Sequence, residues 1–327
     1  MSFDIIALLS TAVALFCPLV IVGFGGMFSE RSGVINLGLE GIMLFGAMFG
    51  CLTLQGFNQK VGGVDTCIVP GFEQLIVLLA ILVSVVTGLV FSLLLSFAAI
   101  KLKANQTITG TALNLLAPAF GMIFIYAIQS NTNTTVLIPT WVRIGVNLVT
   151  VSEFHRFFFS NFFLTTPIIL LLIVVLSIFL YKTRLGLRLR ACGENPQAAD
   201  SVGVNVAKMR YLGVSISGCL AGIGGLAYVI ATASGFQADV GVAGYGFLAL
   251  AVMIFGNWKP LGIIIAGLFF TILRVLPPYL PSIPGIQESG QIYAIIPYVA
   301  TIIVLIIFSK RSRAPKAEGI PYDKSTR

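Results

Sequence analysis

The side chains that most often carry out chemistry are few in this sequence, and their spacing fits no catalytic or metal-binding pattern. The single histidine, His155, lies in a polar-flanked loop without a cluster of cysteines or carboxylates around it. The five cysteines match neither a zinc site nor a disulfide framework, so we expect small apolar fillers between helices. They are Cys17, Cys51, Cys67, Cys192 and Cys219. The sequence therefore predicts no enzyme activity, no metal site and no bound cofactor.

A polar segment over residues 182–210 has the composition of a contact surface. Asn195 can cap a short helix, Pro196 suits its first position, and Gly203 with Asn205 can stop it. The candidate contact residues are Gly193, Glu194, Asn195, Pro196, Gln197, Ala198, Ala199 and Asp200. This helix could dock on a partner protein. The alternative is a solvated loop whose arginines bind the membrane surface.

Isolated polar side chains also punctuate the apolar stretches. Asn36 and Glu40 are four residues apart and would share one helix face. A carboxylate at the start of a span is costly, so we expect Glu40 to pair with Arg31 or to cap a neighbouring helix. Further along the chain, one set of amides and hydroxyls opens another span: Gln106, Thr107, Thr111 and Asn114. These groups, together with Asn36 and Glu40, could line a solute path. The alternative for the amides and hydroxyls is hydrogen bonding between helices, worth about 1 kcal/mol per bond.

Residues 232–246 are too rich in glycine, alanine and polar side chains for a lipid-facing helix. We expect a broken or partly re-entrant segment, which is tolerated where backbone lines a cavity or is buried in protein. Its candidate contacts with a solute or an outer binding protein are Phe236, Gln237, Asp239 and Tyr245. Just before it, Gly218, Gly222, Gly224 and Gly225 form a seam that predicts close helix packing.

The high hydrophobic content indicates that these residues are carried by membrane-spanning helices. Of the 327 residues, 57% are hydrophobic and 10% are charged, against about 25% charged in soluble domains. The apolar residues come in blocks of about 20, the length that crosses a bilayer. We therefore predict an all-α polytopic membrane protein with about nine spans. These are Ile5–Met27, Val34–Leu54, Leu75–Ile100, Thr107–Ile128, Phe162–Tyr181, Tyr211–Ala231, Ala243–Phe255, Leu261–Leu280 and Ile292–Phe308.

The basic residues predict the orientation, because loops on the cytoplasmic side collect Lys and Arg. With nine spans, only Lys60, Arg143 and Arg156 fall on one side. The other side receives Lys101, Lys103, Lys182, Arg184, Arg188, Arg190, Lys208, Arg210, Lys259, Lys310, Arg311, Arg313 and Lys316. Met1 is then outside and the C-terminus is cytoplasmic. The net charge of +8 is explained by topology, so no nucleic-acid partner is expected.

The predicted spans define one transmembrane domain, residues 1–309, with a short tail. The segment 182–210 is a cytoplasmic loop of this domain, and residues 129–161 form its largest outer loop. In that loop Trp141 and the residues 157–159 suit the bilayer interface. The tail, residues 310–327, is basic and contains proline, so we expect it to be disordered and cytoplasmic.

Two motifs resemble those of a known family. The stretch R-L-G-L-R-L-R-A-C-G-E-N-P-Q-A-A-D-S-V-G-V-N-V resembles the cytoplasmic coupling loop of ABC-importer permeases of the ribose and branched-chain amino acid superfamily. The block S-E-R-S-G-V-I-N-L-G-L-E-G-I-M-L-F-G-A is similar to that superfamily's entry into the second helix. Ribose permeases tend to carry Asp where Asn36 stands, and this departure favours the nucleoside branch.

The resemblance implies a bacterial inner-membrane pore subunit and a set of partners. The helix at Asn195–Ala199 would fit a cleft on a cytoplasmic ATPase. That partner subunit, and not this chain, would bind ATP-Mg. This chain has no phosphate-binding loop of its own, so the energy must come from that subunit. The resemblance also implies a second, homologous permease, most simply in a heterodimer, and an extracytoplasmic substrate-binding lipoprotein. Neutral amides and hydroxyls in the path would suit a ribose and a base.

Other readings of the sequence remain open. A permease for simple sugars or branched-chain amino acids belongs to the same class. A stand-alone ion-coupled carrier predicts internal repeats and paired charges within the membrane, and neither is evident. A membrane enzyme would need a nucleophile with its base or a metal site, and the sequence offers none.

Overall fold

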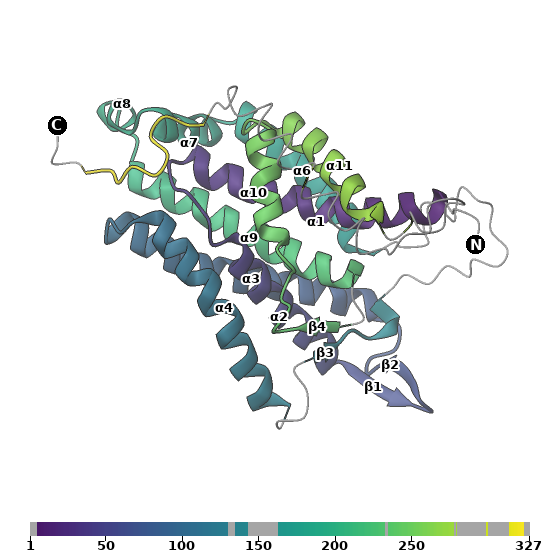
Figure 1. Cartoon of the computed structure of the whole chain (residues 1–327). Coiled ribbons are helices and arrows are strands. Elements are labelled where there is room, and N and C mark those ends of the chain that lie inside the picture. Colours follow the sequence, from purple (N-terminus) through teal and green to yellow (C-terminus); the bar gives the residue numbers. More distant parts are fainter. Residues whose placement is uncertain are drawn as a thin grey trace.

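The computed structural model describes residues 5–129, 135–142, 163–232, 235–277 and 314–323, together with Tyr279 and Val299. Within these ranges the chain is a helical bundle with two small sheets (Figure 1). The helices are α1 Ile5–Arg31, α2 Leu39–Gly56, α3 Glu73–Ser96, α4 Gln106–Ile128, α6 Thr165–Lys182, α7 Arg184–Glu194, α8 Pro196–Ser201, α9 Val206–Thr232, α10 Tyr245–Phe255 and α11 Pro260–Val275. A π-helical turn, Phe97–Lys101, extends α3, and a 3₁₀ turn covers Thr140–Val142.

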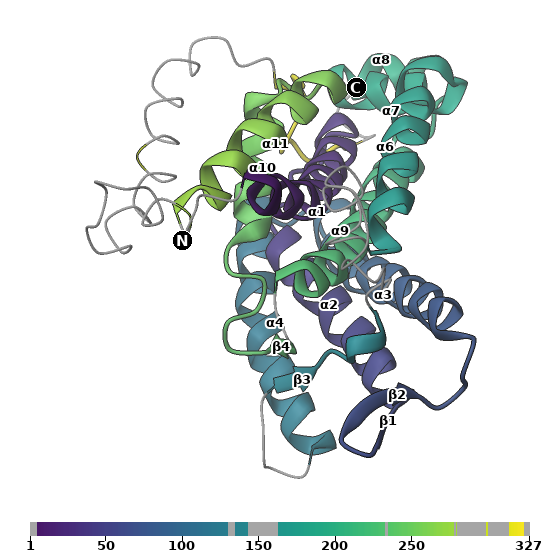
Figure 2. The same ribbon diagram turned by 90° about the vertical axis from the view of Figure 1, so that its right-hand side faces the viewer.

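Helix α9 lies at the centre of the bundle, against α1, α2 and α3 (Figures 1 and 2). Its glycines allow this contact: a Cβ on Gly222 would lie 2.1 Å from the carbonyl oxygen of Ser84, and one on Gly225 would lie 2.0 Å from that of Met43. Both distances are impossible for real atoms. The glycine seam predicted on this span is therefore confirmed as a packing surface.

Aromatic rings fill the space between α2, α3 and α4. The ring centroids of Phe45 and Phe91 are 4.0 Å apart, and those of Phe45 and Phe120 are 5.3 Å apart. Offset aromatic pairs of this kind add about 0.5–1.5 kcal/mol beyond the area that they bury. They attach α4, whose other face is open, to the rest of the bundle.

The predicted count of nine spans is not confirmed. In the described part of the chain, six helices are long and apolar enough to cross a membrane: α1, α2, α3 with its π-turn, α4, α6 and α9. The predicted seventh and eighth spans correspond to the shorter helices α10 and α11. The predicted ninth span, Ile292–Phe308, lies outside the described residues apart from Val299. The multi-pass helical membrane class is confirmed.

Two antiparallel sheets were not predicted. Strands β1, Asn58–Val61, and β2, Val64–Cys67, form a hairpin between α2 and α3. Strands β3, Thr135–Leu137, and β4, Gly235–Gln237, join the outer loop to the break after α9. Trp141, expected at the bilayer interface, donates from its indole nitrogen to Asn58 Oδ1 at 3.1 Å. Residues 157–159 lie outside the described ranges.

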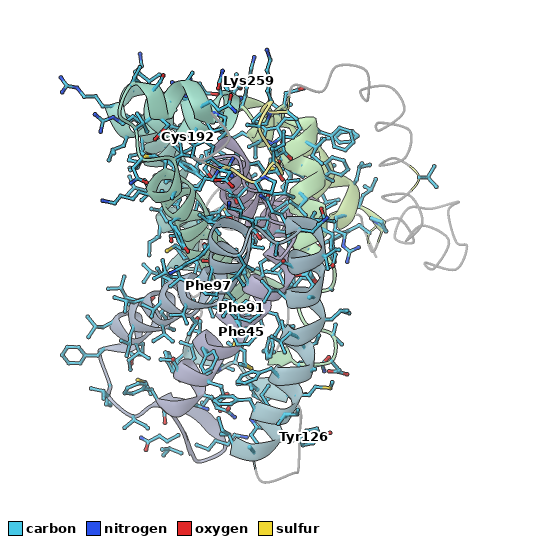
Figure 3. The ribbon with its side chains drawn as sticks, turned by 90° about the vertical axis from the view of Figure 1, so that its left-hand side faces the viewer. Phe45, Phe91, Phe97, Tyr126, Cys192 and Lys259 are labelled. Atoms are coloured by element: carbon cyan, nitrogen blue, oxygen red, sulfur yellow. The ribbon has the colours of Figure 1, made fainter. Side chains whose placement is uncertain are left out.

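The ends of the elements separate into two groups. One end of the bundle, called the inner end below, contains Arg31, the turn 256–259, α7, α8 and the C-terminal segment, residues 314–323. The two sheets lie toward the opposite end (Figure 1), and Figure 3 shows Cys192 and Lys259 at one end with Tyr126 at the other. This grouping is the one that the basic residues predicted. That the inner end is cytoplasmic stays a prediction.

The C-terminal segment differs from the disordered tail that was expected. Pro315 and Ala317 are buried, and the backbone N–H of Ala317 donates to the carbonyl of Gly193 at 2.8 Å. Composition suggested disorder because the segment is polar and short. The prediction fails for residues 314–323 because the inner end offers them hydrogen-bond partners. Residues 310–313 and 324–327 lie outside the described part.

Candidate functional site

The predicted contact helix is present as α8, preceded by α7. The side chain of Thr183 accepts a hydrogen bond from Gly186 N at 3.1 Å and caps α7, and Asn195 Oδ1 accepts from Ala198 N at 3.0 Å and caps α8. Pro196 occupies the first position, as predicted. Gly203, at φ +83°, ends the turn after α8. Asn205 has a different role from the one predicted, because its side chain accepts from Lys208 N and caps α9.

The eight predicted contact residues divide into two faces. Glu194, Asn195, Gln197 and Ala198 are exposed, and Pro196 and Asp200 are half-buried. Gly193 and Ala199 are buried, and Ala199 packs with Cys192 and Val206 in a small apolar cluster. A partner protein could therefore touch the exposed face, while Gly193 and Ala199 hold the helices against the bundle.

Helix α7 ends directly against the end of α1. A Cβ on Gly193 would lie 2.3 Å from the carbonyl oxygen of Arg31, so only glycine permits this approach. The guanidinium of Arg31 lies 3.3 Å from the carboxylate of Glu194 and donates to the carbonyl of Trp258 at 3.0 Å. Arg31 thus joins α1, α7 and the turn 256–259, and it does not pair with Glu40.

Two carboxyl groups lie side by side at the same end, Glu30 buried and Glu318 half-buried. Glu30 is 3% exposed and accepts a hydrogen bond from the indole nitrogen of Trp258 at 2.5 Å. Glu318 of the C-terminal segment lies beside it, and burial raises the pKa of the Glu318 carboxyl, although its hydrogen bond with Glu30 acts in the opposite direction. Burial likewise raises the pKa of the Cys192 thiol to about 11, with Arg210 opposing the shift. Cys192 is thus a buried neutral thiol.

The chain between α1 and α2, residues 32–38, runs back into the bundle as non-helical backbone. Asn36 donates from Nδ2 to Ser217 Oγ on α9 at 2.9 Å. With a rise of about 1.5 Å per residue, Ser217 lies about 16 Å along α9 from its first residue, Val206. Helix α2 therefore begins about halfway through the bundle. Asn36 precedes α2, so it does not share a helix face with Glu40 as predicted.

The amides of α4 satisfy the backbone of this segment. Gln106 Oε1 accepts from Ile35 N at 2.7 Å, and Asn114 bridges the carbonyl of Leu37, at 2.7 Å, and Gly41 N, at 2.8 Å. Unpaired backbone groups are costly away from water. Asn36, Gln106 and Asn114 thus act as a support for a break in the helices.

Glu40 caps a second interrupted helix. Its two carboxylate oxygens accept from Gly244 N at 2.8 Å and Gly246 N at 2.6 Å, at the start of α10. A carboxylate is favoured there because a helix N-terminus carries partial positive charge. The prediction that Glu40 caps a neighbouring helix is confirmed. The break predicted over 232–246 is also confirmed, because α9 ends at Thr232 and α10 begins at Tyr245.

The remaining predicted path residues take different positions. Thr107 and Thr111 are exposed on the open face of α4, and Thr111 Oγ1 donates to the carbonyl of Thr107 within the same helix. Gln237 and Asp239 are exposed beside β4. Phe236 is fully buried and cannot stack on a solute in this conformation.

A cavity that the sequence did not predict lies between α1, α9, α10 and α11, and both polar and apolar side chains line it. It measures about 370 Å³, and its lining residues are Thr11, Leu15, Tyr228, Thr232, Tyr245, Arg274, Val275 and Tyr279. The rings of Tyr228 and Tyr245 lie 4.3 Å apart, and the Tyr245 hydroxyl donates to the Leu15 carbonyl at 3.1 Å. These residues come from four separate helices and, for Tyr279, from the chain after α11, so no local pattern could reveal the cavity.

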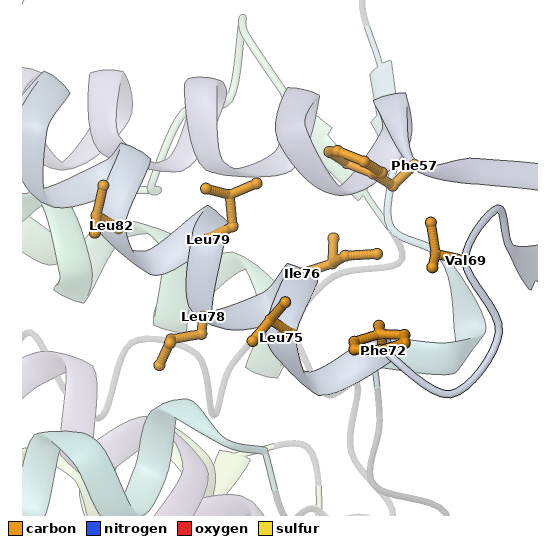
Figure 4. A pocket seen from close by; sticks show the side chains of 8 residues that line it. All are labelled: Phe57, Val69, Phe72, Leu75, Ile76, Leu78, Leu79 and Leu82. Atoms are coloured by element: carbon orange, nitrogen blue, oxygen red, sulfur yellow. The ribbon is translucent and has the colours of Figure 1, made fainter.

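A second hollow, of about 410 Å³, is lined wholly by apolar side chains (Figure 4). Most of these side chains belong to the outer end of α3 and the loop before it, from Val69 to Leu82, and Phe57 completes the set. It has no hydrogen-bonding side chain among its lining residues. It suits lipid chains better than a polar solute.

Comparison of the sequence with known proteins shows the family to which the chain belongs. Residues 8–307 match the family described as the branched-chain amino acid transport system permease component. The chain is 38% identical to the nucleoside ABC transporter permease protein NupC of Lactococcus lactis, covering 94% of each chain. It is 36% identical to the guanosine ABC transporter permease protein NupQ of Bacillus subtilis, covering 99% of this chain and 100% of that one.

A more distant relative comes from the same Lactococcus strain. The nucleoside ABC transporter permease protein NupB is 25% identical over 95% of this chain and 82% of its own length. No solved structure matches the chain. The match over nearly all of the chain shows that this protein belongs to the family of permease components of ABC transport systems.

Proposed function

We propose that the chain is one of two pore-forming permease subunits of an ABC importer for nucleosides. The observation that carries this proposal is similarity over almost the full length to two permeases named for nucleoside or guanosine transport. A separate ATPase would supply the energy, and an outer binding lipoprotein would deliver the solute. NupC and NupB of one bacterium both resemble this chain, which supports a pairing of two different permeases.

The middle of the bundle supports a neutral solute. In transporters with interrupted helices, a free helix N-terminus often binds the anionic group of the substrate. Here the carboxylate of Glu40 already occupies the N-terminus of α10. An amino acid would bring a second carboxylate to this position, whereas a nucleoside or a sugar would not. Among the predicted path residues, the exposed Thr107, Thr111, Gln237 and Asp239 are the best placed to meet the solute.

The test of substrate class is uptake by the whole transporter. The permease pair, its ATPase and its binding protein are reconstituted in liposomes, and ATP-dependent uptake of labelled guanosine is measured. Unlabelled purine and pyrimidine nucleosides should compete, and ribose and leucine should not. Competition by ribose alone would make the chain a sugar permease, and uptake by this chain without ATP or partners would make it a carrier.

The exposed face of α8 supports the coupling role. Replacing Ala198 by Arg puts a long charged side chain on the surface proposed to enter the ATPase cleft, and Ala198 makes no side-chain contact that folding needs. We expect normal protein levels, loss of co-purification with the ATPase and loss of uptake. Ala199 is unsuitable for this test because it is buried against Cys192.

The matched control for this variant is Val64→Arg. Val64 is 62% exposed on β2, near the opposite end of the bundle, so co-purification with the ATPase should be unchanged. Full ATPase binding and uptake by the Ala198→Arg variant would show that α8 is not the docking element.

A further inference from the structure

The C-terminal segment bridges several elements of the inner end. Ala317 N donates to the carbonyl of Gly193 on α7, and the carbonyl of Ile320 accepts from Arg210 Nη1 on α9 at 3.0 Å. Gly319 lies close to the side chain of Ile35, and Asp323 pairs with Lys103 before α4. The segment therefore touches α7, α9, residues 32–38 and the turn before α4.

The same segment covers the apolar contact beneath α8. Tyr322 packs against the cluster of Cys192, Ala199 and Val206, which joins α7, α8 and α9. Cys192 has no exposed surface in this arrangement. Glu318 lies beside Glu30 at the end of α1, so the segment also reaches that helix.

We propose that the C-terminal segment is a working part of the coupling element, holding α7 and α8 against the ends of α1 and α9. This inference rests on the proposed function. When the ATPase displaces α8, the segment keeps α7 and α8 moving with the transmembrane helices. Without it, α8 would bind the ATPase but move independently of the pore.

The existing contacts show why an additional tie is needed. Glu194 is 47% exposed, so its ion pair with Arg31 is worth no more than about 1 kcal/mol. Arg210 is 1% exposed, and in the described structure neither Nε nor Nη2 has a hydrogen-bond partner. The hydrogen bond from Nη1 to the carbonyl of Ile320 therefore lowers the desolvation cost of this buried cation, and loss of the bond would raise that cost.

Docking of the segment is tested first by thiol labelling, which needs no knowledge of the substrate. In a chain with Cys17, Cys51, Cys67 and Cys219 replaced by alanine, Cys192 is the one thiol. Inside-out vesicles that contain the complete transporter are treated with a membrane-impermeant maleimide. Ending the chain after Arg313 should raise the labelling rate of Cys192 by about tenfold or more, because local opening controls access to buried groups.

Point variants separate docking from chain length. Tyr322→Ala removes the cover over the cluster and should also speed labelling of Cys192. Lys316→Gln is the control, since Lys316 is exposed in the same segment, and it should label as slowly as the parent chain. Equal labelling of the truncated, Tyr322→Ala and parent chains would overturn the inference.

The functional test compares transport with ATP hydrolysis. The truncated and Tyr322→Ala transporters should keep their ATPase subunits and hydrolyse ATP, while moving several-fold less solute per ATP. A merely structural role would lower protein level, hydrolysis and transport together, and that result would overturn the coupling role. If the parent transporter moves no nucleoside but Cys192 still becomes accessible on truncation, the proposed substrate fails and the docking survives.

Discussion

Helices begin both at the inner end and in the middle of the bundle, but different kinds of contact cap their first turns. At the inner end the caps are local: Thr183 and Asn195 each bond to a backbone N–H three residues ahead. In the middle the helix starts depend on distant partners, since Glu40 caps α10 and Asn114 supports the start of α2. The starts of α7 and α8 therefore depend on residues of their own segment, whereas those of α2 and α10 depend on side chains from distant parts of the chain.

The largest expected effect comes from the packing of the middle. Gly222→Ala would place a Cβ 2.1 Å from the carbonyl oxygen of Ser84 on α3, and backbone cannot retreat as a side chain can. Overpacking of this severity costs about 3 kcal/mol or more. We expect a much lower melting temperature in detergent and little protein in the membrane.

Gly56→Ala is the matched control, because no atom lies within 4 Å of the added methyl group and the residue also ends a helix. It should melt at or slightly above the parent temperature. If Gly222→Ala behaved like Gly56→Ala, the close contact between α9 and α3 would be wrong, and with it the description of the glycine seam as a packing surface.

The next effect tests the long-range cap. Glu40→Gln keeps the size of the side chain, but it removes the charge and turns an amide NH₂ toward the N–H groups of Gly244 and Gly246. Hydrogen bonds to charged groups contribute about 1.5–3 kcal/mol, so we expect a loss of about 2 kcal/mol in stability, measured by thermal unfolding in detergent. Glu73 at the start of α3 is half-buried and accepts from the nearby Gly71 N–H rather than from a distant helix, so Glu73→Gln should change little.

The same contrast explains what the sequence could predict. The cap at Asn195, proline at Pro196 and the stop at Gly203 are local signals, so α8 was located correctly from the sequence. The helical class and the glycine seam on α9 also follow from residue type and spacing. The role of Glu40 could be narrowed to a cap or an ion pair because a buried carboxylate needs a partner.

Other features lacked a local signal. Val34 to Gly38 is apolar enough to continue a helix, and its non-helical backbone is bonded by distant side chains of α4, Gln106 and Asn114. The hairpin β1–β2 was missed because its short strands, which carry Lys60 and Asp65, resemble a polar loop between two spans. The cavity beside Tyr245 and the docking of residues 314–323 depend on elements that are far apart in the sequence.

The smallest expected effect concerns the ion pair at the inner end. A double-mutant cycle with Arg31→Gln and Glu194→Gln measures the coupling between the two side chains. The Arg31 side chain is 13% exposed and that of Glu194 is 47% exposed, so solvent screens the pair and we expect about 0.5 kcal/mol of coupling. Arg31→Gln alone should cost more than Glu194→Gln, because Arg31 also donates two hydrogen bonds to the carbonyl of Trp258.

The measured coupling energy shows which contacts hold α7 against the bundle. A small value leaves the attachment to the close contact of Gly193 with Arg31, the apolar cluster around Cys192 and the C-terminal segment. A coupling above about 2 kcal/mol would instead make the ion pair the principal tie, far beyond what partly exposed pairs give. In that case removal of residues 314–327 would leave α7 in place, and the C-terminal segment would not be needed to hold it.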